Sequence, residues 1–207
     1  THLVPIKRYG PLTVQRPFYP EQACCHVYML HPPGGIVGGD RLDLQVACKE
    51  TTYALITTPG AAKYYLSAAD TAHVTQQFYV ASDAELEFLP QENIYFPGAQ
   101  VRSNTSINIE SGGRVMLWEK HCFGRPSIKE RFCTGNLYSK IQLRSEGKLL
   151  FSETQRVNAE ELQRTSGMRK YPVMGSFIIY GIDLEKSVLR DLQKIKPGNG
   201  LAGISQP

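Results

Sequence analysis

Ten consecutive residues, His31-Pro32-Pro33-Gly34-Gly35-Ile36-Val37-Gly38-Gly39-Asp40, form the most conformationally marked stretch of this 207-residue chain. It holds two prolines and four glycines, and only its central Ile-Val pair can pack in a core. Glycine adopts φ > 0 at little cost, whereas proline fixes φ and lacks a backbone donor. The stretch predicts a shaped crossing between strands. Its composition favours a structural turn over a functional loop, and its glycine spacing matches neither GxGxxG nor GxxxxGK[ST], which argues against a nucleotide site.

Short segments with alternating apolar and polar residues lie on both sides of this stretch. Val27 and Met29 alternate with His26, Tyr28 and Leu30 before it, and Leu42, Leu44 and Val46 alternate with Asp43 and Gln45 after it. Similar segments recur at short, even spacing, at 51–58, 74–80, 84–89, 105–109, 115–118, 137–143, 149–152 and 176–180. Many short strands at regular intervals predict an all-β body that is layered, barrel-shaped or β-helical. The glycine-containing segments 111–113 and 145–147 predict hairpin turns.

Helix signals are few. Asp183 is placed to cap a helix that ends at Pro197-Gly198 and has an apolar stripe made of Leu184, Val188, Leu192 and Ile195. Residues 159–164 predict a shorter helical turn. We expect both to be peripheral helices that pack on the β body.

Composition excludes several classes of function. The net charge of +4 is spread along the chain without a basic run, which argues against a nucleic-acid partner. No apolar run approaches the roughly 20 residues of a membrane span. The five cysteines have no regular spacing and no CxxC, which favours a reducing, cytoplasmic compartment.

One cluster of possible metal ligands comes just before the marked stretch. It contains Cys24, Cys25, His26 and His31. Neighbours in a strand point to opposite faces, so only Cys24 and His26 would share a side. Such a soft set could hold nickel, copper or zinc. The simpler interpretation is a buried thiol beside a surface imidazole, because the spacing matches no closed zinc pattern.

Several carboxylates stand beside predicted strands: Glu87, Glu92, Glu119, Glu130 and Glu153. Glu85 and Glu87 share one strand face, whereas Glu119 and Glu153 each follow an apolar run. A carboxylate at the end of an apolar strand is either a surface residue or part of a cavity lining, and the residues alone favour the surface. No GxSxG elbow and no Ser/His/Asp order is visible, so no catalytic constellation is predicted.

Further motifs follow one another in a fixed order. They are GPLTVQRPFYPE at 10–21, Cys25-His26, the stretch 31–40, TPGA at 58–61 with Lys63, LPQE at 89–92, FPGA at 96–99 and GRP at 124–126. This order resembles the urease accessory protein UreD family, called UreH in some systems. The resemblance is long and specific from Gly10 to Glu153 and looser beyond.

The resemblance implies a β-helical body of many short strands with one or two peripheral α-helices, and a non-enzymatic role. Members of the family bind the accessory protein UreF and, through it, the GTPase UreG. The complex docks on apo-urease and passes nickel to it, with an internal water-filled tunnel as the proposed route. The implied cofactor is transient, weakly bound nickel, with no organic cofactor, no nucleic acid and no membrane. Residues 1–207 would form one domain that lacks the family's N-terminal strands and C-terminal strand and helix.

Carried over by position, the resemblance places the acidic residues of nickel transfer at Asp40, Glu119 and Glu153. His26, His31 and Glu92 are motif residues of a lesser tier. The loop residues are assigned a structural role: Pro32, Pro33, Gly34, Gly35, Gly38 and Gly39.

The alternative function is a β-helical glycoside hydrolase or sugar-binding protein that uses these carboxylates as acid and base. Such enzymes need two carboxyl groups roughly 5 to 10 Å apart across a cleft. Turnover by the purified protein would distinguish this alternative from the accessory protein.

Overall fold

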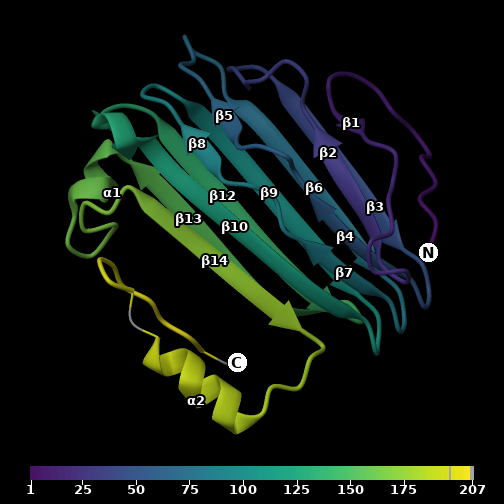
Figure 1. Ribbon diagram of the computed structural model, residues 1–207. Helices are drawn as coiled ribbons and strands as arrows, with labels where there is room; N and C mark the ends of the chain where they lie inside the picture. Colours follow the sequence, from purple (N-terminus) through teal and green to yellow (C-terminus); the bar gives the residue numbers. More distant parts are fainter. Residues whose placement is uncertain (196, 206–207) are drawn as a thin grey trace.

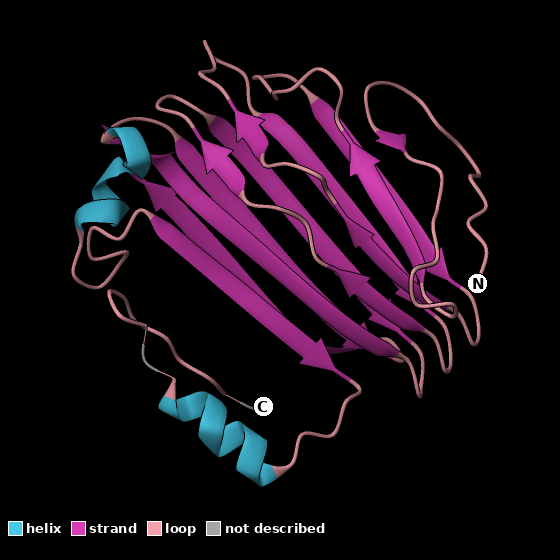
Figure 2. Cartoon of the chain, viewed as in Figure 1, coloured by secondary structure: helices cyan, strands magenta, loops and turns pink. Residues whose placement is uncertain are grey.

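The computed structural model describes residues 1–195 and 197–205, and most of its regular structure is β-strand (Figures 1 and 2). The strands are β1 (Thr13–Val14), β2 (Cys25–Leu30), β3 (Arg41–Cys48), β4 (Tyr53–Thr57), β5 (Ala62–Tyr64), β6 (Ala72–Val80), β7 (Glu85–Phe88), β8 (Asn93–Tyr95), β9 (Gln100–Ile109), β10 (Arg114–Arg125), β11 (Glu130–Arg131), β12 (Asn136–Ser145), β13 (Lys148–Asn158) and β14 (Val173–Tyr180). The helical segments are α1 (Ala159–Gln163), α2 (Lys186–Lys194) and a 3-10 turn, η1 (Pro126–Ile128). The predicted all-β class is confirmed.

The strands form two sheets that lie one over the other (Figure 1). The nine-stranded sheet has the order β1-β2-β4-β7-β10-β8-β5, and β11 and β14 also pair with β10. The five-stranded sheet has the order β13-β12-β9-β6-β3. From β2 to β12 the chain alternates between the sheets, and each new long strand pairs in parallel with the one before it in the same sheet. This coiling is a β-helical solenoid, as predicted, and β13 and β14 close it with antiparallel pairs.

Three of the proline-containing motifs lie beside one another in successive turns of the solenoid. The stretch 31–40 follows β2, 58–61 separates β4 from β5, and 89–92 separates β7 from β8. Hydrogen bonds join neighbouring turns of the solenoid: Gln91 N–H donates to Thr58 Oγ1 at 2.9 Å, and Trp118 Nε1–H on β10 donates to the Pro90 carbonyl at 2.7 Å. In the next turn β10 runs unbroken, pairing first with β7 and then with β8. The breaks therefore open the nine-stranded sheet at one level, and the middle of β10 lies at that level.

Of the two predicted hairpins, one is confirmed and one is wrong. Residues 145–147 join β12 to β13 with Ser145 opposite Lys148, and positive φ at Glu146 and Gly147 fits the tight turn. Residues 111–113 instead carry the chain from β9 in one sheet to β10 in the other. In a parallel solenoid such a glycine turn makes a corner between sheets, and local sequence does not distinguish a corner from a hairpin.

The two helices differ in how they pack. The side chain of Asn158 caps α1 by accepting from Glu161 N–H at 2.8 Å, and α1 buries Leu162, as expected of a packing helix. The predicted cap of α2 at Asp183 is wrong, because this helix starts at Lys186 after Glu185, which makes no side-chain capping bond. The predicted packing of α2 is also wrong: among the described residues it buries none, and it lies away from both sheets (Figure 1). No described helix combines the length and apolar character needed to cross a membrane.

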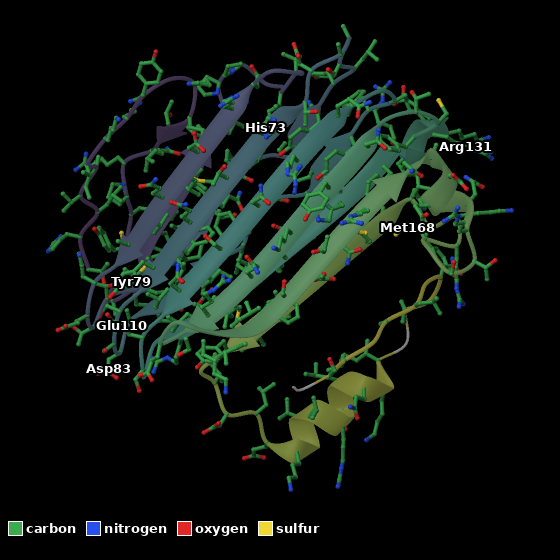
Figure 3. All side chains as sticks on the ribbon, turned by 180° about the vertical axis from the view of Figure 1, so that it is seen from behind. His73, Tyr79, Asp83, Glu110, Arg131 and Met168 are labelled. Atoms are coloured by element: carbon green, nitrogen blue, oxygen red, sulfur yellow. The ribbon has the colours of Figure 1, made fainter. Side chains whose placement is uncertain are left out.

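A carboxylate at one end of the solenoid predicts acid sensitivity. Figure 3 shows Tyr79, Asp83 and Glu110 gathered there. The pKa of Glu110 is lowered by the hydroxyl of Tyr79 and the backbone N–H of Ser82, both of which donate to its carboxylate. Because the pKa of the folded state lies below the ordinary value of 4.5, this stabilisation is present above that pH and is lost as pH falls through the lowered pKa.

We therefore expect the Glu110→Gln protein to lose less thermal stability on acidification than the unmodified protein. The midpoints of thermal unfolding, measured from about pH 7 to about pH 3, should converge as the carboxylate becomes protonated. Parallel curves for the two proteins would contradict this assignment.

Candidate functional site

A layer of polar side chains divides the core between the two sheets. Inward-facing residues near one end of the strands form one apolar cluster, which includes Phe78, Ile107 and Leu117, and those near the other end form a second, which includes Val101 and Phe123. Between the clusters, the inward positions are polar: Gln76 on β6, Ser103 and Thr105 on β9, Glu119 and His121 on β10, Ser139 on β12, Glu153 and Gln155 on β13, and Ser176 on β14. We call this set the polar layer.

Glu119 is the carboxylate at the centre of the polar layer. It is only 6% exposed. Thr105 donates to Oε1 at 2.9 Å from β9, and Ser139 donates to Oε2 at 3.1 Å from β12. His121 Nε2 lies 3.3 Å from Oε2. Glu119 therefore receives hydrogen bonds across the sandwich from two strands of the facing sheet, which offset part of the cost of burying a carboxylate.

A chain of aromatic residues continues from His121. The Tyr95 hydroxyl lies 2.9 Å from His121 Nδ1, and the Tyr95 ring stacks on Tyr64 and Phe123. Burial raises the pKa of both tyrosines, and the Glu119 carboxylate adds to the effect. The imidazole of His121 therefore contacts both neighbours, with Nε2 toward the Glu119 carboxylate and Nδ1 toward the Tyr95 hydroxyl.

A cavity of about 100 Å³ leads to Glu119 from the broken strands of the nine-stranded sheet. It has room for several water molecules. Its polar lining includes half-buried His31 and Thr58 and exposed Gln91 at the motif breaks, and Gln76, Ser103 and Glu119 in the interior. The motifs that interrupt the sheet therefore lead to the buried carboxylate.

Glu153 lies in the same layer, toward the antiparallel strands that close the solenoid. Ser176 on β14 donates to Glu153 Oε2 at 2.9 Å, and Gln155 donates to its other oxygen. Ser176 is also the register partner of Glu119 on β10. The structure therefore places Glu119 and Glu153 in the same polar layer, in two hydrogen-bonded clusters on neighbouring strands.

His31 and Asp40 are the first and last residues of the stretch 31–40. Asp40 Oδ2 accepts from Val37 N–H at 2.9 Å, so the carboxylate holds the loop's own backbone. Burial lowers the pKa of His31, and the nearby Asp40 carboxylate opposes that shift. His31 lines the cavity. Asp40 thus stands near the cavity mouth, whereas Glu119 lies inside.

The two remaining candidates, Glu92 and His26, lie apart from the polar layer. Glu92 lies close enough to Cys122, on the outer side of β10, to contribute to the raised pKa of that thiol. His26 stands on the outer face of β2, and the predicted sharing of a side by Cys24 and His26 is confirmed. The structure therefore separates His26 and Glu92 from Glu119 and Glu153.

The resemblance pointed to Glu119 and Glu153 but not to the hydrogen-bond donors around them. Thr105, Ser139, His121 and Tyr95 hold the site together, and none was singled out from the sequence. A signal was present, since each of the first three is a polar residue at an inward position of a strand whose inward residues are mostly apolar. That signal becomes useful only when the register across sheets is known.

The sequence of this chain is similar to sequences of known proteins. A family model described as UreD urease accessory protein matches residues 1–207. The chain is 44% identical to the urease accessory protein UreD of Escherichia coli over 180 residues, covering 87% of this chain and 64% of that protein. Against the UreD proteins of Alcanivorax borkumensis and Aliivibrio fischeri it is 43% and 42% identical, covering 89% and 87% of this chain and 63% of each relative. The chain thus spans 63 to 64% of the length of these relatives. It belongs to the UreD urease accessory protein family.

Proposed function

We propose that this protein is a non-enzymatic factor for nickel insertion into urease, and that the polar layer carries the ion. The single observation behind the proposal is the buried carboxylate of Glu119, reached by a cavity from the interrupted sheet and followed by a second carboxylate, Glu153. An ion-conducting path must bind its ion well enough to admit it and weakly enough to release it. Carboxylate and hydroxyl groups that already take part in hydrogen bonds with neighbouring side chains are ligands of this intermediate strength. The imidazole ring of histidine is a suitable ligand for nickel.

The expected partners follow from membership of the family. We propose that the protein binds UreF directly and UreG through UreF, and that this complex docks on apo-urease. A reducing cytoplasm is the proposed compartment, because all five cysteines are free thiols and three of them are buried. Nickel is cargo here, bound only in transit.

The hydrolase alternative receives no support from the site. Glu119 lies between two sheets rather than along an open cleft, and its oxygens are occupied by Thr105, Ser139 and His121. A glycosidase needs both carboxyl groups to reach a sugar and a water molecule. We therefore propose no catalytic residue.

Reconstitution tests the proposal. The purified protein is combined with UreF, UreG, apo-urease and Ni²⁺, and the nickel bound to urease is measured with and without it. We expect nickel loading and urease activity to rise only when this protein is present and the complex forms. Complex formation without any gain in nickel would overturn the proposed transport role, and absence of the complex would overturn the proposed partners.

Glu153→Ala is expected to lower nickel loading of urease while the complex still assembles. Loss of one ligand along a path should reduce transfer by roughly tenfold, in line with the effect of removing a supporting group at a metal site. Thr154→Ala is the matched control, because Thr154 is the next residue on β13 and points to the opposite face.

Asp40→Ala should also lower loading, since Asp40 holds the loop at the cavity mouth. Full loading with both Glu153→Ala and Asp40→Ala would rule out this route.

A further inference from the structure

Three potential metal ligands of different chemistry meet outside the sheet sandwich. A carboxylate oxygen of Glu21, the thiol sulfur of Cys24 and a ring nitrogen of His26 all lie within 4.8 Å of one another. Cys25, between them in sequence, points inward and belongs to an apolar core cluster. Because neighbours alternate in a strand, His26 lies on the outer face of β2, away from the polar layer, and the thiol of Cys24, just before the strand, lies on the same side.

Local structure holds these ligands in place before any ion arrives. Phe18 and His26 exchange two backbone hydrogen bonds, of 3.1 and 2.9 Å, which fold the segment before β2 back onto that strand. The turn between them has positive φ at Gln22, which brings Glu21 back beside His26. The ring of Phe18 packs 5.3 Å from the imidazole and limits its rotation. Preorganised ligands lose less conformational entropy when they bind an ion.

His26 has a buried nitrogen without a partner. Nε2 is shielded from solvent and accepts or donates no hydrogen bond among the described residues. Glu21 Oε2 lies 3.7 Å away, which is too long for a hydrogen bond. An unsatisfied buried polar atom is costly, and a bound ion would satisfy it.

We propose that Glu21, Cys24 and His26 bind one divalent ion of the Zn²⁺ and Ni²⁺ class, with water at the remaining position. Thiolate, imidazole and carboxylate are the ligands that such borderline ions take, and three protein ligands leave a position open for exchange. The Glu21 side chain is 61% exposed, so the ion can enter from solvent. This inference does not rest on the proposed function, because it concerns an ion held outside the polar layer.

Binding is coupled to the release of a proton. Burial raises the pKa of the Cys24 thiol to about 11, with smaller contributions from the carboxylates of Glu87 and Glu21, against hydrogen bonds from Tyr53 and the Leu55 backbone. The free thiol is therefore protonated at neutral pH. When the ion binds, the S–H bond breaks, the sulfur donates its electron pair to the metal, and the proton passes to solvent. Metal binding at this site therefore releases a proton from the protein.

Titration of the metal-free protein with Co²⁺ tests this site, because a thiolate ligand gives a near-ultraviolet charge-transfer band. We expect one equivalent to produce the band, Zn²⁺ or Ni²⁺ to displace the cobalt, and Cys24→Ser to abolish the band. Glu21→Gln and His26→Gln should each weaken affinity by at least about tenfold. Because Glu21 is exposed, the cobalt affinity of Glu21→Gln tests the proposed site even if substitution of buried Cys24 impairs folding.

Two controls separate this site from other ligands. Cys133→Ser removes an exposed thiol and should leave the band intact. Glu119→Gln alters the polar layer and should leave cobalt affinity at this site unchanged, so failure here is distinguishable from failure of the nickel path. A charge-transfer band that survives Cys24→Ser, or unchanged affinity in both Glu21→Gln and His26→Gln, would overturn the proposal.

Discussion

Glu119→Gln is expected to reduce nickel loading of urease by at least about tenfold while the protein folds and joins its partners normally. Glutamine has the shape of glutamate and can still bond to the hydroxyls of Thr105 and Ser139, so the layer stays filled. What the substitution removes is the negative charge that would attract a cation into the buried cavity. The measurement is nickel per urease active site after reconstitution, with the thermal midpoint of the variant taken in parallel.

The expected combination of effects separates a transport role from a structural one. If Glu119 served only to link the sheets, loading would follow stability, and a folded glutamine variant would load urease fully. Glu110→Gln is the matched control, since Glu110 is a half-buried carboxylate at one end of the solenoid, outside the polar layer. Nickel loading by the Glu119→Gln protein equal to that of Glu110→Gln would remove Glu119 from the path.

The polar layer is hard to explain by stability alone. Replacing buried ionic groups by well-packed apolar residues is often neutral or stabilising. Here Glu119 and His121 occupy inward positions of β10 between Leu117 and Phe123, both of which are fully buried apolar residues. An apolar residue at these positions would join the two core clusters into one. A polar layer that separates them, at a cost in stability, is expected of an interior with a function rather than of a scaffold.

Much of the fold could be predicted from the sequence because period-two alternation directly reports strands with one buried face. The hairpin at 145–147 was predicted for the same local reason, since Glu146-Gly147 suits a two-residue turn. The corner at 111–113 was not, because its two flanking strands pair with different sheets. Parallel pairing joins residues far apart in sequence, and only the three-dimensional register shows which turns are corners.

The candidate site was predictable only in part for a similar reason. The residues alone favoured a surface location for Glu119, and that interpretation is wrong: alternation continues through Leu117 and Phe123 and turns Glu119 inward. The predicted pairing of Cys24 with His26 needed only strand geometry and is confirmed. A turn with positive φ at Gln22 brings Glu21 beside Cys24 and His26, and no sequence pattern predicts this turn.

Gly38→Ala is expected to destabilise the protein by about 2 to 3 kcal/mol, through overpacking. A methyl group at Gly38 would lie 1.9 Å from Ser67 Oγ and 2.5 Å from the backbone carbonyl oxygen of Asp70. Ser67 could rotate away, but the carbonyl belongs to a segment held to the loop by the Gly39 N–H bond to Thr71. The loop would have to move off its neighbour, and the midpoint of thermal unfolding should fall by about 5 to 10 °C.

Gly60→Ala is the matched control and should not lower the stability of the protein. Gly60 lies in the adjacent motif, its φ is not positive, and a methyl group there meets nothing within 4 Å. Reduced entropy of the unfolded chain then predicts a neutral or stabilising effect of up to about 1 kcal/mol. Equal midpoints for Gly38→Ala and the unmodified protein would mean that the loop is not pinned to residues 67–71. The expected difference between the two variants would show that glycine is needed at position 38 because two chain segments pack closely there. A left-handed backbone is not the reason, since φ of Gly38 is not positive. This packing fixes the loop that begins with His31 at the cavity mouth.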